Sequence, residues 1–229
     1  MAGIKVEVWS DIVCPWCYIG KRRLEAAVAA LGTPVELTWR SFELDPNAPQ
    51  RHTLPMTELL AKKYGMSVKQ AEQAQTRVTE TAAADGLTFA LDKAQGGNTF
   101  QGHRLIQRAK ERGLGDAMKE RLMRAYFTEG RPISDPATLR ALALEVGLTA
   151  EDVTAAFETP LYAEQVRADE QQAQRLGIRG VPFFVIGGKY GVSGAQPAEV
   201  LAQAIAQAQR ELTPEITQGP TCDDDVCEI

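Results

Sequence analysis

The stretch that decides the fold runs from Ile4 to Trp39 and reads IKVEVWSDIVCPWCYIGKRRLEAAVAALGTPVELTW. Apolar and polar residues alternate over residues 4–8 and again over residues 35–39, which is the period of a half-buried strand. Over residues 15–31 the apolar side chains recur at near-helical spacing, and this pattern stops at a Gly-Thr-Pro sequence. Strand, helix and strand in this order predict a βαβ unit with a right-handed crossover.

The rest of the chain changes character twice. From Leu54 to Leu176 the strand signal nearly disappears, and Gly and Pro residues divide this helix-favouring stretch into about six expected helices. Strand character returns at Val181–Ile186, and Gly187-Gly188 predicts a tight hairpin turn into another strand. An alanine-rich helix follows and ends near Leu212. We therefore expect an α/β domain in two halves, residues 1–50 and 161–212, with a helical insertion at 51–160 and an acidic tail at 213–229.

Composition and charge narrow the possible partners. Lys and Arg total 25 against 30 Asp and Glu, a formal net charge of −5 over 229 residues. No Lys- or Arg-rich run offers a surface that would follow a phosphate backbone, so we expect no nucleic-acid partner. No apolar run reaches about 18 residues and the N-terminus lacks the pattern of a signal peptide. These features predict no membrane association and a cytoplasmic location.

Two of the four cysteines, Cys14 and Cys17, stand where the first strand gives way to the first helix. In a reducing compartment structural disulfides are rare, so paired cysteines indicate catalysis, redox sensing or metal binding. A thiol attacks as a thiolate, and the free N–H groups and dipole of a helix N-terminus favour that anion. We therefore expect Cys14 to be a nucleophile with a lowered pKa. Cys17, one turn along and more buried, is the expected resolving thiol.

Two other interpretations of this pair remain. A zinc site would need two further ligands, and the second cysteine or histidine pair of a zinc ribbon is missing at any familiar spacing. Cys222 and Cys227 are the other cysteines that might supply them, and the first pair might also be inert core residues. The order of strand, motif and helix favours redox chemistry, so we expect neither a metal nor another cofactor.

Motifs along nearly the whole chain carry a resemblance to a known family. They are Ser10-Asp11 to Cys17, Trp39 to Leu44, Asn98-Thr99 with His103-Arg104-Leu105, Gly180 to Phe184, and Val192 to Gln196. Together they resemble the DsbA-like thiol oxidoreductases, and within these they are most similar to the FrnE-like branch. The resemblance implies a thioredoxin-like α/β fold with a large all-α insertion, the two halves predicted above forming the thioredoxin-like domain. It also implies thiol-disulfide oxidoreductase or isomerase activity on protein disulfides, and leaves the direction of electron flow open.

The same resemblance assigns roles to residues outside the cysteine motif. It places Pro182 opposite the reactive cysteines as a cis-proline, with the backbone of Val181 free to pair with an extended substrate. An ordinary proline at a strand start is the alternative. Trp16, between the cysteines, is expected to be partly exposed on an apolar substrate rim. His103 and Asn98 are further candidates for substrate binding, although a histidine near a helix start more often has a capping or structural role.

The acidic tail holds the second cysteine pair, Cys222 and Cys227. Asp223–Asp225, Glu228 and the terminal carboxylate surround it, and negative charge raises thiol pKa values. A pair without a stabilised thiolate has the more stable disulfide, so electrons are expected to pass from the tail dithiol to an oxidised first pair. The alternative is a passive or metal-binding tail.

Three classes of function therefore remain open at the level of sequence. The favoured one is a thiol-disulfide oxidoreductase whose partners are protein thiols and disulfides, with glutathione as a further candidate partner. The second is a glutathione-dependent isomerase or transferase similar to the kappa class, which does not keep the two-cysteine motif. The third is a peptide-binding chaperone that uses the same groove without turnover.

Overall fold

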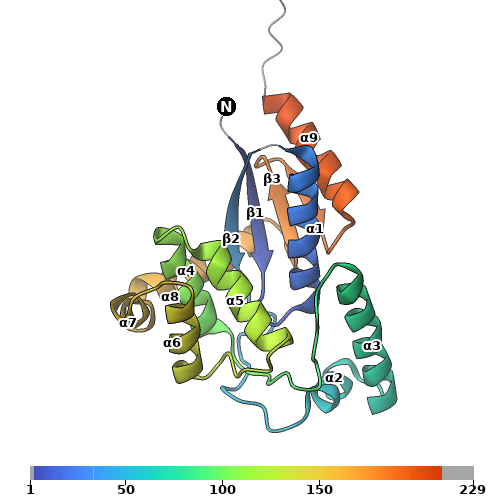
Figure 1. Cartoon of the computed structure of the whole chain (residues 1–229), viewed down its shortest axis with the longest axis vertical. Helices are drawn as coiled ribbons and strands as arrows, with labels where there is room; N and C mark the ends of the chain where they lie inside the picture. The colour runs from blue at the N-terminus through green and yellow to red at the C-terminus, as the bar shows by residue number, and fades with distance from the viewer. Residues whose placement is uncertain (1–2, 33, 213–229) are drawn as a thin grey trace, which may run out of the picture.

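A four-stranded sheet and a large helical segment make up the molecule (Figure 1). The computed structural model describes residues 3–32 and 34–212. In chain order the elements are β1 (Ile4–Ser10), α1 (Pro15–Leu31), β2 (Val35–Ser41), α2 (Met56–Tyr64), α3 (Val68–Ala84), α4 (Phe100–Glu111), α5 (Gly115–Phe127), α6 (Pro136–Glu145), α7 (Ala150–Glu158), α8 (Pro160–Arg175), β3 (Phe183–Ile186), β4 (Tyr190–Ser193) and α9 (Ala198–Leu212).

The sheet has the strand order β2-β1-β3-β4. Strands β1 and β2 are parallel and stay in register along their whole length, while β3 runs antiparallel to β1 and β4 antiparallel to β3. The predicted βαβ unit and the predicted hairpin are both confirmed. Gly187 and Gly188 have φ values of 61° and 69°, the left-handed conformation that a tight turn asks of glycine.

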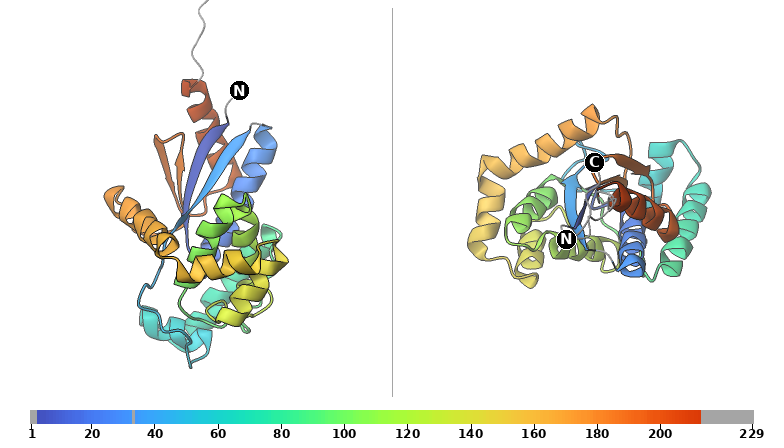
Figure 2. Two further views of the ribbon diagram at one scale, coloured as in Figure 1. Left: turned by 90° about the vertical axis from the view of Figure 1, so that its left-hand side faces the viewer. Right: turned by 90° about the horizontal axis from the view of Figure 1, so that it is seen from above.

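The two faces of the sheet bury different side chains. Ile4, Val6 and Val8 alternate along β1 into the main core, which lies under α1 and α9. Trp9 points to the other face and packs with Ala173 of α8 and with Ile178. Figure 2 shows α1 and α9 on one side of the sheet and α8 on the other. The sheet is therefore covered on both faces, as in other α/β folds.

Seven helices, α2 to α8, lie between β2 and β3. The sequence predicted about six; Thr159 alone separates α7 from α8. Helix α4 packs against α5, α7 and α8, so it is the central helix of this segment. The arrows of β1 and β2 point toward the segment, and α1 begins at the same end of the sheet (Figure 1). Residues that follow β1 and β2 are thereby brought against the helices.

The helices of the described ranges differ from a membrane span in length, in hydropathy or in both. None of them is both long enough and apolar enough to cross a bilayer.

Candidate active site

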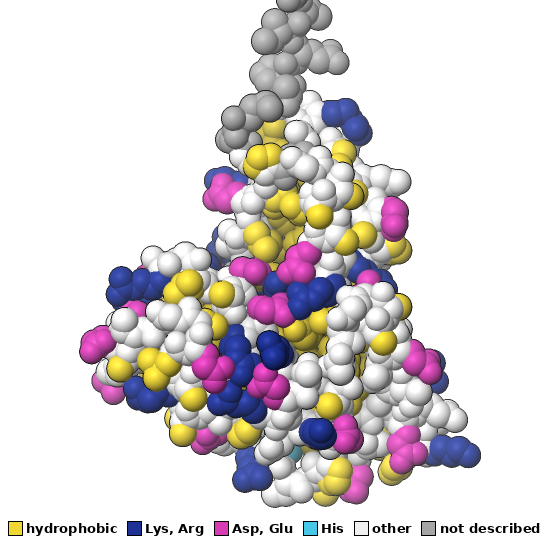
Figure 3. Space-filling model, viewed as in Figure 1, with side chains coloured by type: hydrophobic (Ala, Val, Ile, Leu, Met, Phe, Trp, Pro, Cys, Tyr) yellow, Lys and Arg dark blue, Asp and Glu magenta, His cyan; other side chains and the backbone are white. Residues whose placement is uncertain are grey.

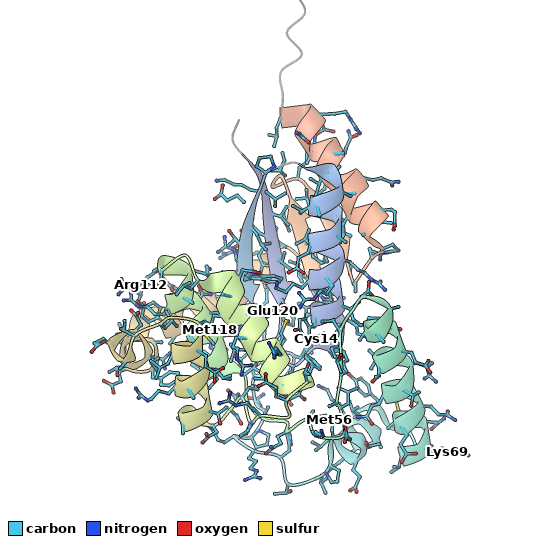
Figure 4. All side chains as sticks on the ribbon, in the orientation of Figure 1. Cys14, Met56, Lys69, Arg112, Met118 and Glu120 are labelled. Atoms are coloured by element: carbon cyan, nitrogen blue, oxygen red, sulfur yellow. The ribbon has the colours of Figure 1, made fainter. Side chains whose placement is uncertain are left out.

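The dithiol motif sits at the start of α1. Cys14 is the N-cap residue, with φ −88° and ψ 114°, and Pro15 fills the first helical position, where a missing N–H costs nothing. Both thiols are free and buried, Cys14 being 4% exposed and Cys17 1%. Figure 4 shows Cys14 at the end of α1 that faces the helical segment. The motif thus lies between the sheet and the helices.

The segment before β3 approaches the same helix end. The Val181-Pro182 peptide bond is cis, and the Cys14 thiol lies 3.5 Å from the Val181 carbonyl oxygen, to which it donates. One turn along α1, a Cβ added at Gly20 would lie 3.0 Å from Cγ of Pro182 and 3.3 Å from Cζ of Phe184. Only a residue without a side chain lets the helix come this close to Pro182. The predicted juxtaposition of Cys14 and Pro182 is therefore present in the fold.

A buried carboxylate ties the motif to its neighbours. Asp11 accepts hydrogen bonds at Oδ1 from the backbone N–H of Ile12 (2.7 Å) and from Nε2 of His103 (3.1 Å), and at Oδ2 from the N–H of Leu44 (2.8 Å). Burial opposes ionisation of Asp11, but these bonds and the positive charge of Lys119 outweigh it and lower its pKa. Asp11 therefore stays an anion and connects the loop after β1 with α4 and with the segment after β2.

Helix α5 adds a buried cation to the same place. The Lys119 side chain is 1% exposed, and its Nζ donates to the Ser10 carbonyl oxygen at 3.1 Å and lies 5.7 Å from the ring centroid of Trp39. Burial lowers the pKa of Lys119 to about 8, although the nearby Cys17 and Asp11 act in the opposite direction. An ammonium group thus lies behind the dithiol.

The two thiols share a hydrogen bond, and burial opposes the ionisation of each of them. The hydrogen bond to Cys17, followed by burial, raises the pKa of the Cys14 thiol well above its ordinary value. Burial also opposes ionisation of Cys17, but the bond from Cys14, the charge of Lys119 and the Ser10 hydroxyl outweigh it and lower the Cys17 pKa. The two directions belong to a pair that shares one hydrogen bond, and the role of Cys14 as the nucleophile stays a prediction.

Comparison with known proteins identifies the family. The family described as the DSBA-like thioredoxin domain matches residues 5–206. The chain belongs to this family. A crystal structure of a probable DsbA oxidoreductase from Streptomyces coelicolor shares 45% identity, covers 99% of each chain and superposes with a TM-score of 0.85. The uncharacterised protein YwbO of Bacillus subtilis is 29% identical over 91% of this chain and 98% of its own.

A more distant structure shares the fold of this DsbA-like protein. It is the cytosolic disulfide reductase DsbM of Pseudomonas aeruginosa, at 20% identity, with 91% of this chain and all of that chain covered and a TM-score of 0.61. It has also been solved with GSH. At this identity the likeness shows the fold alone. With the family match, the thioredoxin-like fold with helices inserted between β2 and β3 is established, and the DsbA-like protein is a thiol-disulfide oxidoreductase. The narrower FrnE-like placement stays a prediction.

The residues expected to touch substrate differ in their surroundings. Trp16 is 45% exposed, in keeping with a rim, and Val181 is half-buried beside Cys14. His103 is buried and bonded to Asp11, so its ring offers no surface to a partner in this structure. Asn98 accepts from the N–H of Phe100 (2.9 Å) at the start of α4 and lies beside the loop after β2, a position that orders the backbone. Cys222 and Cys227 lie outside the described residues.

The sequence did not indicate that Lys119 and Ser10 of the DsbA-like protein lie near the dithiol. Lys119 belongs to a helical stripe that is otherwise apolar, with Met118, Leu122 and Met123 buried on the same face of α5. A lysine inside an apolar stripe at helical spacing is the signal that would have found it. Ser10 carried no such signal, since it acts through the loop geometry at the end of β1.

Proposed function

We propose that the DsbA-like protein exchanges disulfides with protein substrates through Cys14 and Cys17. Cys14 forms the mixed disulfide and Cys17 resolves it. The observation that carries the proposal is the contact of the Cys14 thiol with the Val181 carbonyl oxygen at 3.5 Å. A substrate segment that pairs with the backbone at Val181 would bring its own sulfur to Cys14, the thiol nearer the surface.

The exchange starts when Cys14 loses its proton, since the thiolate is the attacking form. The Cys14 thiolate bonds to one sulfur of the substrate disulfide, and the other substrate sulfur leaves as a thiolate. Cys17 then attacks the Cys14 sulfur and releases the second substrate thiol, which takes the proton of Cys17. The substrate gains two electrons and the Cys14–Cys17 pair loses two; the reverse sequence oxidises a substrate dithiol.

The surface around the two cysteines indicates which kind of partner they would meet. Trp16 offers an exposed aromatic surface next to the cysteines, and exposed aromatic residues favour protein partners. Glutathione is the second candidate, supported by the GSH complex of DsbM, which has the same fold. A cytoplasmic location remains part of the proposal, because a reducing compartment would keep Cys14 and Cys17 available as thiols.

The tail cysteines form the last part of the proposal. Acidic neighbours raise the pKa values of Cys222 and Cys227 and so favour their disulfide. The tail dithiol would then reduce an oxidised Cys14–Cys17 pair, two electrons passing within one chain. Turnover is expected to slow in the double variant Cys222→Ser, Cys227→Ser, and unchanged turnover would leave the tail passive.

An insulin-reduction assay tests the proposal. The wild-type protein, supplied with a dithiol reductant, should accelerate precipitation of the insulin B chain, and Cys14→Ser should fall to the rate of the reductant alone. Suppression of aggregation that survives in Cys14→Ser, without any turnover by the wild type, would instead support a chaperone. Turnover that depends on glutathione but not on Cys17 would support the glutathione-dependent alternative.

A further inference from the structure

Gly20 lies in the interior of α1, where glycine is an unfavourable residue. It is buried on the helix that begins with the dithiol motif. Glycine in a helix interior is less stable than alanine, because it loses more backbone freedom on folding. Gly20 does not have a positive φ, so its backbone conformation is open to any residue. The reason for a glycine here must therefore lie in what surrounds it.

The closest neighbours of Gly20 belong to the segment that carries the cis-proline. A Cβ added at Gly20 would lie 3.0 Å from Cγ and 3.5 Å from Cβ of Pro182, and 3.3 Å from Cζ of Phe184. Carbon atoms in contact prefer separations of ~3.5–4.0 Å, so a methyl group would need about half an ångström more room. The ring of Pro182 cannot supply this room by a change of rotamer, since it is closed onto the backbone.

The segment is also held on its other side. The carbonyl oxygen of Pro182 accepts from the N–H of Gly194 at 2.8 Å. Phe183 and Phe184 follow in β3, which is paired with β1 on one edge and with β4 on the other. A methyl group at Gly20 would therefore separate α1 from this segment, whichever of the two moved. Cys14 is the N-cap of α1, so its distance from the segment would grow as well.

We propose that Gly20 is a positioning residue that sets the distance between Cys14 and the backbone of Val181. Its missing side chain lets the Cys14 thiol lie 3.5 Å from the Val181 carbonyl oxygen. The consequence for turnover rests on the proposed function, in which an extended substrate pairs at Val181 while its sulfur meets Cys14. The geometric part concerns the folded protein alone.

The proposal predicts a selective effect on substrates. A protein disulfide needs both the Cys14 sulfur and the backbone at Val181, and it needs them at one fixed separation. A small disulfide such as hydroxyethyl disulfide has no peptide backbone, so it needs the sulfur alone. Gly20 therefore favours protein disulfides over small ones, and an added methyl group should reduce this preference.

The kinetics of Gly20→Ala with the two kinds of substrate test this selectivity. The KM for insulin should rise about tenfold, the factor that corresponds to the loss of about one backbone hydrogen bond. The kcat for insulin and the rate with hydroxyethyl disulfide should stay within about twofold of the wild type. Gly20→Ser, with a larger side chain, should raise the insulin KM at least as much. A general loosening of the fold would instead weaken exchange with both substrates.

Gly115→Ala is the matched control, because it also adds a methyl group to a helix. The nearest neighbours of a Cβ at Gly115 are atoms of the Lys110 side chain and backbone, the closest being Cγ at 2.7 Å. This variant should leave the KM for insulin unchanged. An unchanged insulin KM in both Gly20 variants would overturn the inference, and so would equal losses with insulin and hydroxyethyl disulfide.

A second variant covers the case in which Gly20→Ala does not fold. Phe184→Leu removes the ring tip that lies 3.3 Å from the added Cβ, so the methyl group gains room. The double variant is then compared with Phe184→Leu alone, and equal insulin KM values in these two proteins would overturn the inference.

A crystal structure of the Gly20→Ala protein, or of the double variant, separates the inference from the proposed function. The distance from Cys14 Sγ to the Val181 carbonyl oxygen should exceed the 3.5 Å of the wild type by several tenths of an ångström. An unchanged distance would contradict the role of Gly20, whatever the kinetics. Failure of the wild-type protein to reduce insulin would count against the proposed function, and the measured distance would still judge Gly20.

Discussion

Two buried lysines, Lys21 on α1 and Lys119 on α5, have opposite surroundings. Lys21 is 3% exposed and forms ion pairs with Glu25, with Asp116 at 3.2 Å and with Glu120 at 3.1 Å. Figure 3 shows acidic and basic side chains together where α1 meets α5. Lys119 is 1% exposed and has no ion pair within the described residues.

The difference separates a buried lysine that is paired with carboxylates from one that is not. Burial opposes the charge of Lys21, but its carboxylate partners outweigh burial and raise its pKa. Burial prevails at Lys119 and lowers its pKa to about 8. The carboxylates around Lys21 therefore neutralise it, whereas Lys119 has no carboxylate partner within the described residues.

The largest effect is expected when the resolving thiol is removed. Cys17→Ser should lower multiple-turnover disulfide exchange to background, because the mixed disulfide at Cys14 loses its resolving thiol. Lys21→Met should keep most of the turnover, since Lys21 is paired with carboxylates. Insulin reduction by the two variants makes the comparison, and loss of turnover in both would remove the distinction between the lysines.

The next effect concerns stability. Lys21→Met should lower the free energy of unfolding by about 2 kcal/mol, because it leaves three carboxylates without their shared cation. Lys119→Met in the oxidised protein should cost less than ~1 kcal/mol or stabilise it, since an apolar side chain replaces an unpaired buried charge. Urea unfolding of the oxidised proteins measures both values. The opposite ranking would show that Lys119 is the structural lysine.

The free energy of unfolding should depend on pH because Lys119 is buried. Its folded-state pKa of about 8 lies below the ordinary value of 10.5, so between these pH values the unfolded chain binds more protons than the folded one. Above pH 10.5 neutral Lys119 no longer lowers the free energy of unfolding, and as the pH falls through about 8 this gain in stability is lost. The free energy of unfolding of the wild type minus that of Lys119→Met should rise with pH across this window, by at most ~1.4 kcal/mol per pH unit. A flat or falling difference would contradict the burial of an ammonium group.

The smallest effect is expected at the rim, away from both lysines. Trp16→Ala should raise the KM for a protein disulfide roughly fivefold, which corresponds to about 1 kcal/mol of lost apolar contact. Exchange with a small disulfide should stay within twofold of the wild type, because such a substrate does not reach the rim. If Trp16→Ala weakened exchange equally with both substrates, Trp16 would support the structure of the Cys14–Cys17 motif and would not bind substrate.

Sequence and structure agree where local patterns carry the information. The alternation at Ile4–Val8, the helical stripe that follows Cys14 and the glycine turn at Gly187-Gly188 correctly predicted the βαβ unit and the hairpin. The position of Lys119 was not predictable in this way. It follows Cys17 by about a hundred residues, and side-chain contacts join its helix α5 to α1.

His103 illustrates the same limit. The sequence offered it as a substrate-binding candidate, and its neighbours in the chain contain no sign of its partner. The bond to Asp11 forms because α4 packs against the loop after β1, which brings together two residues from distant parts of the chain. Short-range patterns identify elements and motifs, while the partners of a buried polar group follow from tertiary packing.

One measurement tests the central claim most directly: the mapping of the mixed disulfide. Cys17→Ser protein with serine at 222 and 227 is mixed with an oxidised, unfolded protein substrate, quenched with acid and digested, and its disulfides are identified by mass spectrometry. The account predicts one accumulating link, between Cys14 and a substrate cysteine, and none in the matched variant that carries Cys14→Ser with Cys17 intact. A link to Cys17 in that matched variant, or no link to Cys14 at any substrate concentration, would contradict it.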